Sequence, residues 1–450
     1  MEPLAWFATT PEGEKLGRLA AEMVRTEWRR VPLWLAPIEP FRWLISLLST
    51  GYPHAKWLAV VYGFLALAVG LTVFWRWRTL WWHRTLVATT VALNTLLTLA
   101  GGYIAVSWLH SVLPVGRHWV VPSEAPFILA NLHTHTTQSN GFLTPEQALL
   151  WHYRRGYRVV AITDSNTVRG GELARSFAER TKLPITVLAG EEFRGSTHLV
   201  LLNIRQDLSP RHFDVPAAIA EAKRQGGFVI AAHPWTSRHH IADLIAWGIE
   251  GMEIANNATL ADERLRKLCQ QHRLTAVASL DFRGGYRPAV ATVLPREATT
   301  PEKVAQALRE GKCAALYLPP HLSPPGFQPL QSWWGELCDL WRTGWMVNLT
   351  GLLFWFAVLW WWRQRFRTVR RREQSWRFFI GASLFTLAAF VLTAGLGVWA
   401  MGREFKEGWF PPLPLVIAVW AVLCPANWWM WGQMAFAFAP AVRQSGRCRT

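Results

Sequence analysis

The stretch FILANLHTHTTQSNG, residues 127–141, decides the fold class of this chain of 450 residues. Its first six residues form a mostly apolar run of strand length, and His133-Thr134-His135 follows directly. Residues i and i+2 of an extended strand point to the same side, so both imidazoles can face one metal ion. A single His-x-His is a weak signal, and it gains weight only if other strands end in a similar way.

Strand-like and helix-like segments alternate along the chain after this stretch. Such alternation predicts a parallel α/β fold, for which a barrel is the natural closed form. Functional side chains then gather where the strands end. The predicted strands are 127–132, 158–163, 185–189, 198–204, 228–232, 251–255, 275–280 and 288–294, and the predicted helices are 144–155, 171–182, 215–225, 261–272 and 300–311.

Nearly every one of these predicted strands brings an acid or an imidazole to one of its ends. A purely structural explanation would need the same coincidence five or six times, so the pattern predicts one shared metal site. The residues concerned are Asp164 after the second strand, Glu191 and Glu192 after the third, His198 at the start of the fourth, His233 after the fifth and Asp281 after the seventh.

The ordered series NLHTHTTQSNG, AITDSN, AGEEF, THLVLLNI, AAHPW, GMEIAN and SLDFRGG resembles the motifs of the PHP (polymerase and histidinol phosphatase) family. PAVATVLPREATTPEKVAQALREGK resembles the strand and helix that close those domains, so the resemblance covers about residues 127–317. The resemblance implies a distorted (β/α)7 barrel with up to three divalent metal ions. It also implies hydrolysis of phosphomonoesters, phosphodiesters or nucleotides, and the family has a membrane-anchored branch.

The ligands of two of the family's metal ions are matched in this chain, whereas those of the third are not. Asn140, Ser165 and Arg283 stand where the third ion's ligands would be. The resemblance therefore implies two divalent ions (Zn, Mn or Fe), which together can activate a hydroxide for in-line displacement. The matched ligands are His133, His135, Glu192 and Asp281 for the first ion and Glu192, His198 and His233 for the second.

Asp164 and Arg283 are the predicted catalytic residues beside these ligands. Arg283 could offer a fixed positive charge to a phosphate in place of the third ion, or it could simply pack against a lost pocket. Asp164 is expected to orient a ligand or a water molecule. Glu191 is a weaker candidate than Glu192 because the family pattern is Gly-x-Glu. The histidines at 152, 212, 239 and 240 are expected at the surface or in linkers.

The composition points to a membrane protein, since 51% of residues are hydrophobic, 17% are charged and 29 are tryptophans. An average soluble protein has about 25% charged residues, and tryptophan gathers at membrane–water interfaces. Segment 31–50 suits an interfacial helix better than a span. Five runs approach the ~20 residues needed to cross a bilayer, and they are 57–75, 85–109, 343–362, 378–402 and 413–437.

The net charge of +17 is explained by topology, because the loop 363–377 holds seven arginines and one acid. Such a loop is expected on the cytoplasmic side, so no nucleic acid is expected as a partner. The prediction is a multi-pass protein of the cytoplasmic (inner) membrane with its barrel on the outer side. Its parts are 1–55, 56–113 with two spans, the barrel 114–325, a linker 326–342, 343–442 with three spans, and the basic tail 443–450.

The expected function is that of a membrane-anchored, metal-dependent phosphoesterase. Its expected substrate is a phosphorylated small molecule or a lipid-linked phosphate, with membrane lipid as a further partner. One alternative is hydrolysis of a carboxylic ester or amide on the same metal centre. Another is a sensing or binding domain with reduced catalysis. A transport component is the weakest alternative, because the predicted spans hold almost no charge.

Overall fold

The computed structural model describes residues 4–28, 33–38, 52–76 and 117–318, except 142, 258 and 285–287, together with 338, 345–358, 360 and isolated positions between 81 and 96. The chain divides into two compact units. The first unit comprises Met1–His54 and Val106–Arg365, and the second comprises Ala55–Ala105 and Phe366–Thr450. The α/β domain belongs to the first unit.

Every strand and helix predicted between residues 127 and 311 is present, with ends shifted by a few residues. The strands are β1 (Ala5–Phe7), β2 (Arg25–Trp28), β3 (Arg117–Val120), β4 (Phe127–Asn131), β5 (Val159–Ser165), β6 (Thr186–Arg194), β7 (His198–Leu202), β8 (Phe228–Ala231), β9 (Gly251–Asn256), β10 (Thr259–Leu260), β11 (Thr275–Ser279), β12 (Val290–Pro295) and β13 (Ala314–Tyr317). The helices are α1 (Pro11–Met23), α3 (Tyr52–Arg76), α5 (Pro145–Arg154), α6 (Arg169–Thr181), α7 (Val215–Arg224), α8 (Ile241–Trp247), α9 (Glu263–Gln271) and α10 (Pro301–Arg309), with short 3-10 turns at Leu33–Ile38 and Pro234–Thr236.

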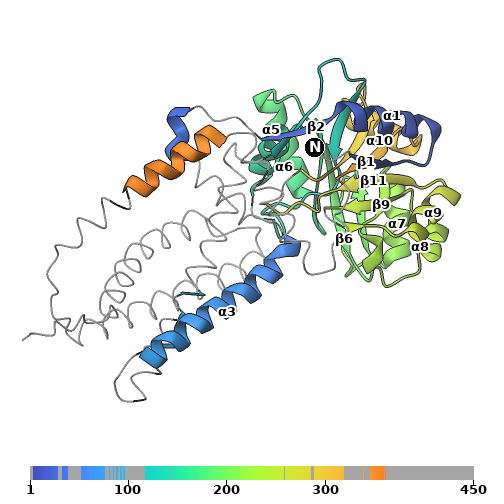
Figure 1. The fold of residues 1–450 in the computed structure, drawn as a ribbon. Helices are drawn as coiled ribbons and strands as arrows, with labels where there is room; N and C mark the ends of the chain where they lie inside the picture. The colour runs from blue at the N-terminus through green and yellow to red at the C-terminus, as the bar shows by residue number, and fades with distance from the viewer. Residues whose placement is uncertain are drawn as a thin grey trace, which may run out of the picture. The chain divides into compact units, whose positions relative to one another are not determined.

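Polar N-caps explain where several of these helices begin. Thr144, Asp214, Asp262 and Thr300 each accept a hydrogen bond from a backbone N–H in the first turn of α5, α7, α9 and α10. Such a side chain satisfies a donor that the helix itself leaves open. Helices α5, α6, α7, α8 and α9 lie around the outside of the strands (Figure 1).

The strands form a half-barrel, so the predicted closed (β/α)7 barrel is wrong in its closure. The main sheet runs in the order β1-β13-β12-β4-β5-β6-β7-β8-β9-β10, and β11 pairs with β9 beside this path. β12 pairs along β4 in antiparallel fashion and so occupies the edge that a closing strand would need. Within the described residues, an isolated bridge between Thr134 and Phe282 links the end of β4 to the end of β11.

The prediction of parallel strands throughout is also wrong, because β7 runs antiparallel to both β6 and β8. A tight connection joins β6 to β7, and Arg194 lies opposite His198 in their register. The first residue of an antiparallel strand lies at the edge where its neighbour ends. His198 therefore reaches the same rim as Glu192, although it begins its strand.

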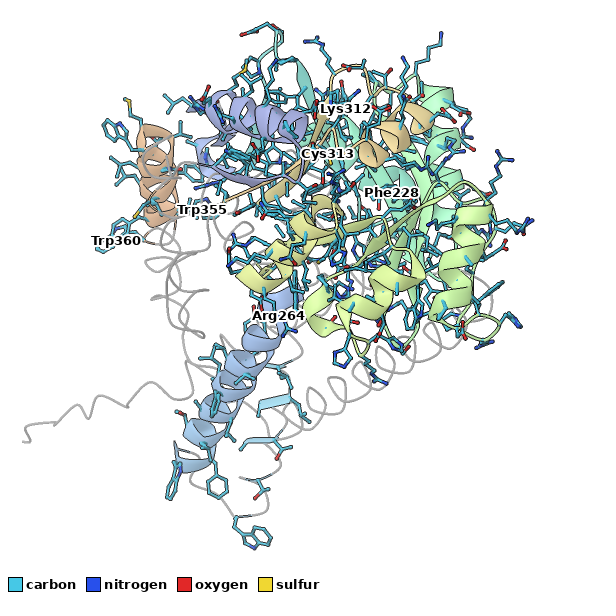
Figure 2. All side chains as sticks on the ribbon, turned by 90° about the vertical axis from the view of Figure 1, so that its right-hand side faces the viewer. Phe228, Arg264, Lys312, Cys313, Trp355 and Trp360 are labelled. Atoms are coloured by element: carbon cyan, nitrogen blue, oxygen red, sulfur yellow. The ribbon has the colours of Figure 1, made fainter. Side chains whose placement is uncertain are left out.

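Alternation along the strands builds two apolar layers, one inside the half-barrel and one under the helices. In β5, Val159 and Ala161 face the inner layer, whereas Val160 and Ile162 face the outer one. Phe228 of β8 belongs to the inner layer, and Figure 2 shows it among the strands. Successive side chains of a strand point to opposite faces, so each strand contributes to both layers.

The N-terminal segment 4–28 belongs to the same unit as the sheet. β1 pairs antiparallel with β13, with Trp6 opposite Leu316. The Thr10 hydroxyl donates to the Gly311 carbonyl oxygen at 2.6 Å. β2 pairs with β3. In place of the predicted interfacial helix over 31–50, the described part is a 3-10 turn, and residues 39–50 lie outside the described ones.

The predicted membrane spans are wrong for the part of the chain that the structure describes. None of the helices found there is long and apolar enough to cross a bilayer. The predicted inner-membrane location depended on those spans and is contradicted by the same finding, and the membrane-anchored branch of the resemblance is left without support. Runs 378–402 and 413–437, loop 363–377 and tail 443–450 lie outside the described residues, as does most of 85–109.

Candidate metal centre

Six predicted ligands from five parts of the sheet meet at one rim of the half-barrel. His133 and His135 follow β4, Glu192 lies near the end of β6, and His198 begins β7. His233 follows β8 and Asp281 follows β11. Two sets of these side chains have ligand atoms that all lie within 4.8 Å of one another. They are His133, His135 and Glu192, and Glu192, His198 and His233.

The first group consists of His133, His135, Asp281 and one oxygen of Glu192. The Nε2 atoms of His133 and His135 lie 3.2 Å apart. Asp281 Oδ1 lies 3.0 Å from His135 Nε2 and 3.5 Å from His133 Nε2. Glu192 Oε2 lies 3.4 Å from His135 Nε2. Two imidazole nitrogens and two carboxylate oxygens thus converge on one small volume.

The second group is formed by His198, His233 and the other oxygen of Glu192. His198 Nδ1 lies 2.9 Å and His233 Nε2 lies 3.2 Å from Glu192 Oε1. Because Oε2 faces the first group and Oε1 the second, Glu192 joins the two. Its neighbour Glu191 points to the other face of β6, where it accepts a hydrogen bond from the Leu208 backbone N–H.

The chemistry of this donor set fits divalent transition-metal ions. Imidazole nitrogens and carboxylate oxygens are the ligands that zinc, iron and manganese use. Glu192 Oε2 is buried and accepts no hydrogen bond from the described residues, as expected of an atom arranged for an ion, although His135 Nε2 and Arg194 Nε each lie 3.4 Å from it. The assignment of the six side chains as ligands remains a prediction, which this arrangement supports.

His133 is fully buried and has three carboxylates around it. Burial by itself would lower the pKa of His133, but the carboxylates of Asp281, Glu253 and Glu192 raise it to about 9. An imidazole must lose its proton to bind a metal ion. The proton on His133 and an ion at the first group therefore exclude one another.

Glu192 is held in its ionised form despite being buried. Burial would raise its pKa, but hydrogen bonds from His198 and His233 and the charges of His135 and His133 hold the pKa well below its usual value. An ionised carboxylate with one oxygen on each side is the group needed to bridge two cations.

Two of the candidate ligands lie in left-handed backbone, where non-glycine residues are uncommon. The φ angle is 30° at His233 and 46° at Asp281. Such conformations cost about 1–3 kcal/mol each and persist only where surrounding contacts enforce them. Their position at this rim is consistent with backbone shaped for a site.

Asp164 is fully buried and does not touch the candidate ligands of either group through any hydrogen bond among the described residues. Its oxygens accept from the Thr136 N–H at 2.7 Å, the Thr136 hydroxyl at 2.7 Å and the Ser139 hydroxyl at 2.6 Å. Ser139 Oγ also lies 3.3 Å from His135 Nδ1. Asp164 therefore holds the loop that follows His135, in agreement with an orienting role.

Arg283 lies directly beside the first group. Its Nη2 donates to both oxygens of Asp281 at 3.0 Å. Burial would raise the pKa of Asp281, but His133, His135 and Arg283 lower it. The guanidinium thus brings positive charge to the rim and helps to orient a candidate ligand.

His152 was expected at the surface, but it is fully buried beneath the site. Its Nδ1 donates to the Ala148 carbonyl oxygen at 2.7 Å, and its Nε2 accepts from Asn131 Nδ2 at 2.9 Å. Asn131 Oδ1 accepts from the Leu280 N–H at 2.9 Å. This network ties the end of β4 to the end of β11, next to His133. Nothing in the local sequence marks His152 as buried apart from its place on the inner side of α5.

The stability of the chain should depend on the neutral state of His152. Burial lowers the pKa of His152 from 6.5 to about 3, so between these values the unfolded chain binds a proton that the folded chain excludes. Stability conferred by this group is complete above pH 6.5 and falls by about 1.4 kcal/mol per pH unit as the pH drops towards 3. Denaturant titrations of wild type and His152→Gln between pH 7 and 4 should show the shallower slope in the variant. Identical slopes would contradict this assignment.

The role of Glu253 was also missed, because GMEIAN counted only as one motif of the family resemblance. Glu253 is fully buried, and its Oε1 accepts from His133 Nδ1 at 3.0 Å. Its Oε2 accepts from the His233 backbone N–H at 2.8 Å. The contact with His133 spans 120 residues of sequence, so no local pattern could have indicated it.

No protein-family model matches the chain. Over 118 residues it is 29% identical to an uncharacterized protein of Methanocaldococcus jannaschii, and the match covers 24% of this chain and 68% of that protein. It is similar in structure to a two-domain protein from Bacteroides vulgatus that is described as containing a predicted PHP-like metal-dependent phosphoesterase, with 22% identity, a TM-score of 0.39, and coverage of 48% of this chain and 72% of that one. It is also similar to an amidohydrolase from Chromobacterium violaceum with bound sulfate and no metal, with 18% identity, a TM-score of 0.30, and coverage of 34% and 87%. These likenesses concern the fold, and the chemistry of this chain follows from its own residues.

Proposed function

We propose that this chain is a metal-dependent phosphoesterase that hydrolyses a phosphomonoester or phosphodiester of a small molecule. The observation that carries the proposal is the position of Glu192, whose carboxylate lies within 3.8 Å of four imidazole nitrogens, two from each metal group. A bridging carboxylate between two imidazole pairs is the arrangement used to hold two divalent ions close together.

Each residue of the centre has a definite task in this proposal. Asp281 completes the first group, and Arg283 keeps its carboxylate turned towards His135. Asp164 holds the loop that carries His135 in place through Thr136 and Ser139. Two divalent ions bound there would lower the pKa of a water molecule and stabilise negative charge on the phosphate oxygens.

Arg283 is the proposed substrate-facing cation of the site. It lies at the first group, where the sequence lacks the ligands of a third ion. A guanidinium has a planar fork of donors that matches a phosphate. Arg283 would therefore favour binding of an anionic phosphate ester over binding of a neutral carboxylic ester. This preference for charge is what separates a phosphoesterase from an esterase on the same centre.

Metal removal tests the proposed function. The full chain, treated with a chelator and dialysed, should hydrolyse an aryl phosphate at background rate and recover its activity when zinc or manganese is added. Arg283→Met with metal restored should lose activity on the aryl phosphate by about tenfold or more, the equivalent of one charge-assisted hydrogen bond. Faster cleavage of a neutral aryl ester or anilide than of the phosphate would overturn the phosphoesterase assignment. If the chain binds no metal, its assignment as a metal-dependent enzyme is wrong.

A further inference from the structure

Glu253 lies within β9, away from the candidate ligands in sequence, yet it contacts both metal groups. Its Oε1 lies 3.0 Å from His133 Nδ1 in the first group. Its Oε2 lies 2.8 Å from the backbone N–H of His233 in the second group and 2.8 Å from Asn256 Nδ2. One fully buried carboxylate therefore accepts three hydrogen bonds.

The contact with His133 sets which ring nitrogen of that residue can bind a metal ion. Two of the three groups around Glu253, the His233 backbone N–H and the Asn256 side-chain NH₂, can only donate, so the surroundings of this side chain fit an ionised carboxylate. An ionised carboxylate only accepts hydrogen bonds, and His133 Nδ1 must carry the hydrogen. The lone pair then resides on Nε2, which is the atom that faces His135 and Asp281.

The contact with His233 acts on the backbone rather than on the ring. His233 has φ 30° and ψ 63°, a left-handed conformation without the freedom of glycine. Its N–H is held by Glu253 Oε2, and its ring is turned so that Nε2 lies 3.2 Å from Glu192 Oε1. The direction of this ligand therefore depends on the same carboxylate.

We propose that Glu253 is a positioning residue that prepares both metal groups at once. It fixes the Nε2-ligating tautomer of His133 and holds the backbone from which His233 reaches Glu192. This inference rests on the proposed two-ion centre and adds to it a residue that binds neither ion. Carboxylates that orient ligating histidines typically change metal affinity 10–100-fold when they are removed.

Glu253→Gln separates the two tasks, because the surrounding donors dictate how the new amide must lie. The side-chain oxygen has to face the His233 N–H and Asn256, since an NH₂ group there would meet the backbone donor. The NH₂ group then faces His133 Nδ1, which must accept, and the hydrogen of the ring moves to Nε2. The second group keeps its backbone hydrogen bond, whereas the first loses a ligand.

The experiment is a zinc titration of the full-length metal-free chain, read by equilibrium dialysis against a competing chelator. Wild type should bind two ions. Glu253→Gln should bind the second group's ion with little change and the first group's ion about 10–100-fold more weakly. The ¹⁵N shifts of labelled histidine at alkaline pH should show His133 changing from the Nδ1–H to the Nε2–H form, while the retained zinc affinity of the second group shows that the fold is intact.

Glu250→Gln is the matched control. Glu250 lies three positions earlier and accepts from the Val229 N–H at 3.1 Å, away from the candidate ligands. It should leave both affinities unchanged. Two ions bound with wild-type affinity in Glu253→Gln, together with an unchanged His133 tautomer, would overturn the positioning role while leaving the proposed function intact. A wild-type chain that takes up no zinc would overturn both.

Discussion

Glu192→Gln should abolish hydrolysis and weaken binding at both metal groups, because this is the one side chain that they share. The change keeps the shape of the side chain but removes the negative charge between four histidines. A neutral amide cannot bridge two cations, so we expect the rate to fall by at least about a thousandfold, or about 4 kcal/mol of transition-state stabilisation. Steady-state kinetics and the zinc content of the purified chain measure the two effects.

Glu191→Gln is a control that differs from this variant by one position. Glu191 lies on the opposite face of β6, and burial raises its pKa to about 8. Its carboxyl accepts from the Leu208 N–H, a bond that an amide oxygen can also make. Glu191→Gln should keep both ions and nearly full activity. Two zinc ions retained by Glu192→Gln would contradict the bridging role.

Gly170→Ala should destabilise the fold and loosen the first metal group through a purely steric effect. A Cβ at Gly170, in the first turn of α6, would lie 1.9 Å from Asp164 Oδ2 and 3.0 Å from Thr136 Oγ1. Asp164 would have to move and release the loop after His135. Overpacking of this kind costs about 1–3 kcal/mol, and broken buried hydrogen bonds add to it, so a loss of about 3 kcal/mol is expected. Denaturant unfolding and zinc affinity measure the two consequences.

Ser176→Ala, on the exposed side of the same helix, controls for helix propensity. Among the residues that the structure describes, its hydroxyl donates to the Glu172 carbonyl oxygen one turn earlier and to no other group. We expect a change within about 0.5 kcal/mol and no change in zinc affinity. A free energy of unfolding equal to that of wild type in Gly170→Ala would show that Asp164 can shift without cost. That result would contradict the role of Asp164 as the anchor of the His135 loop.

Sequence patterns predicted the strand ends well because they depend on neighbours along the chain. Alternation in LAGEEF places Leu188 and Glu192 on the inner face and Glu191 on the outer one, as the two apolar layers require. The family resemblance selected the same glutamate. The membrane prediction failed where composition was taken as evidence of architecture, since none of the described helices is suited to crossing a bilayer.

The sequence by itself determined the α/β alternation, the strand ends and the set of side chains able to bind metal, because these follow from local periodicity and residue chemistry. Only the tertiary structure decided that β7 runs antiparallel and so brings His198 to the rim. It also decided that Glu253 bonds His133 across 120 residues, and that β1 completes the sheet beside β13. Strand direction and long-range contacts depend on which distant backbone edges and side chains meet, and that information is distributed over the whole folded chain.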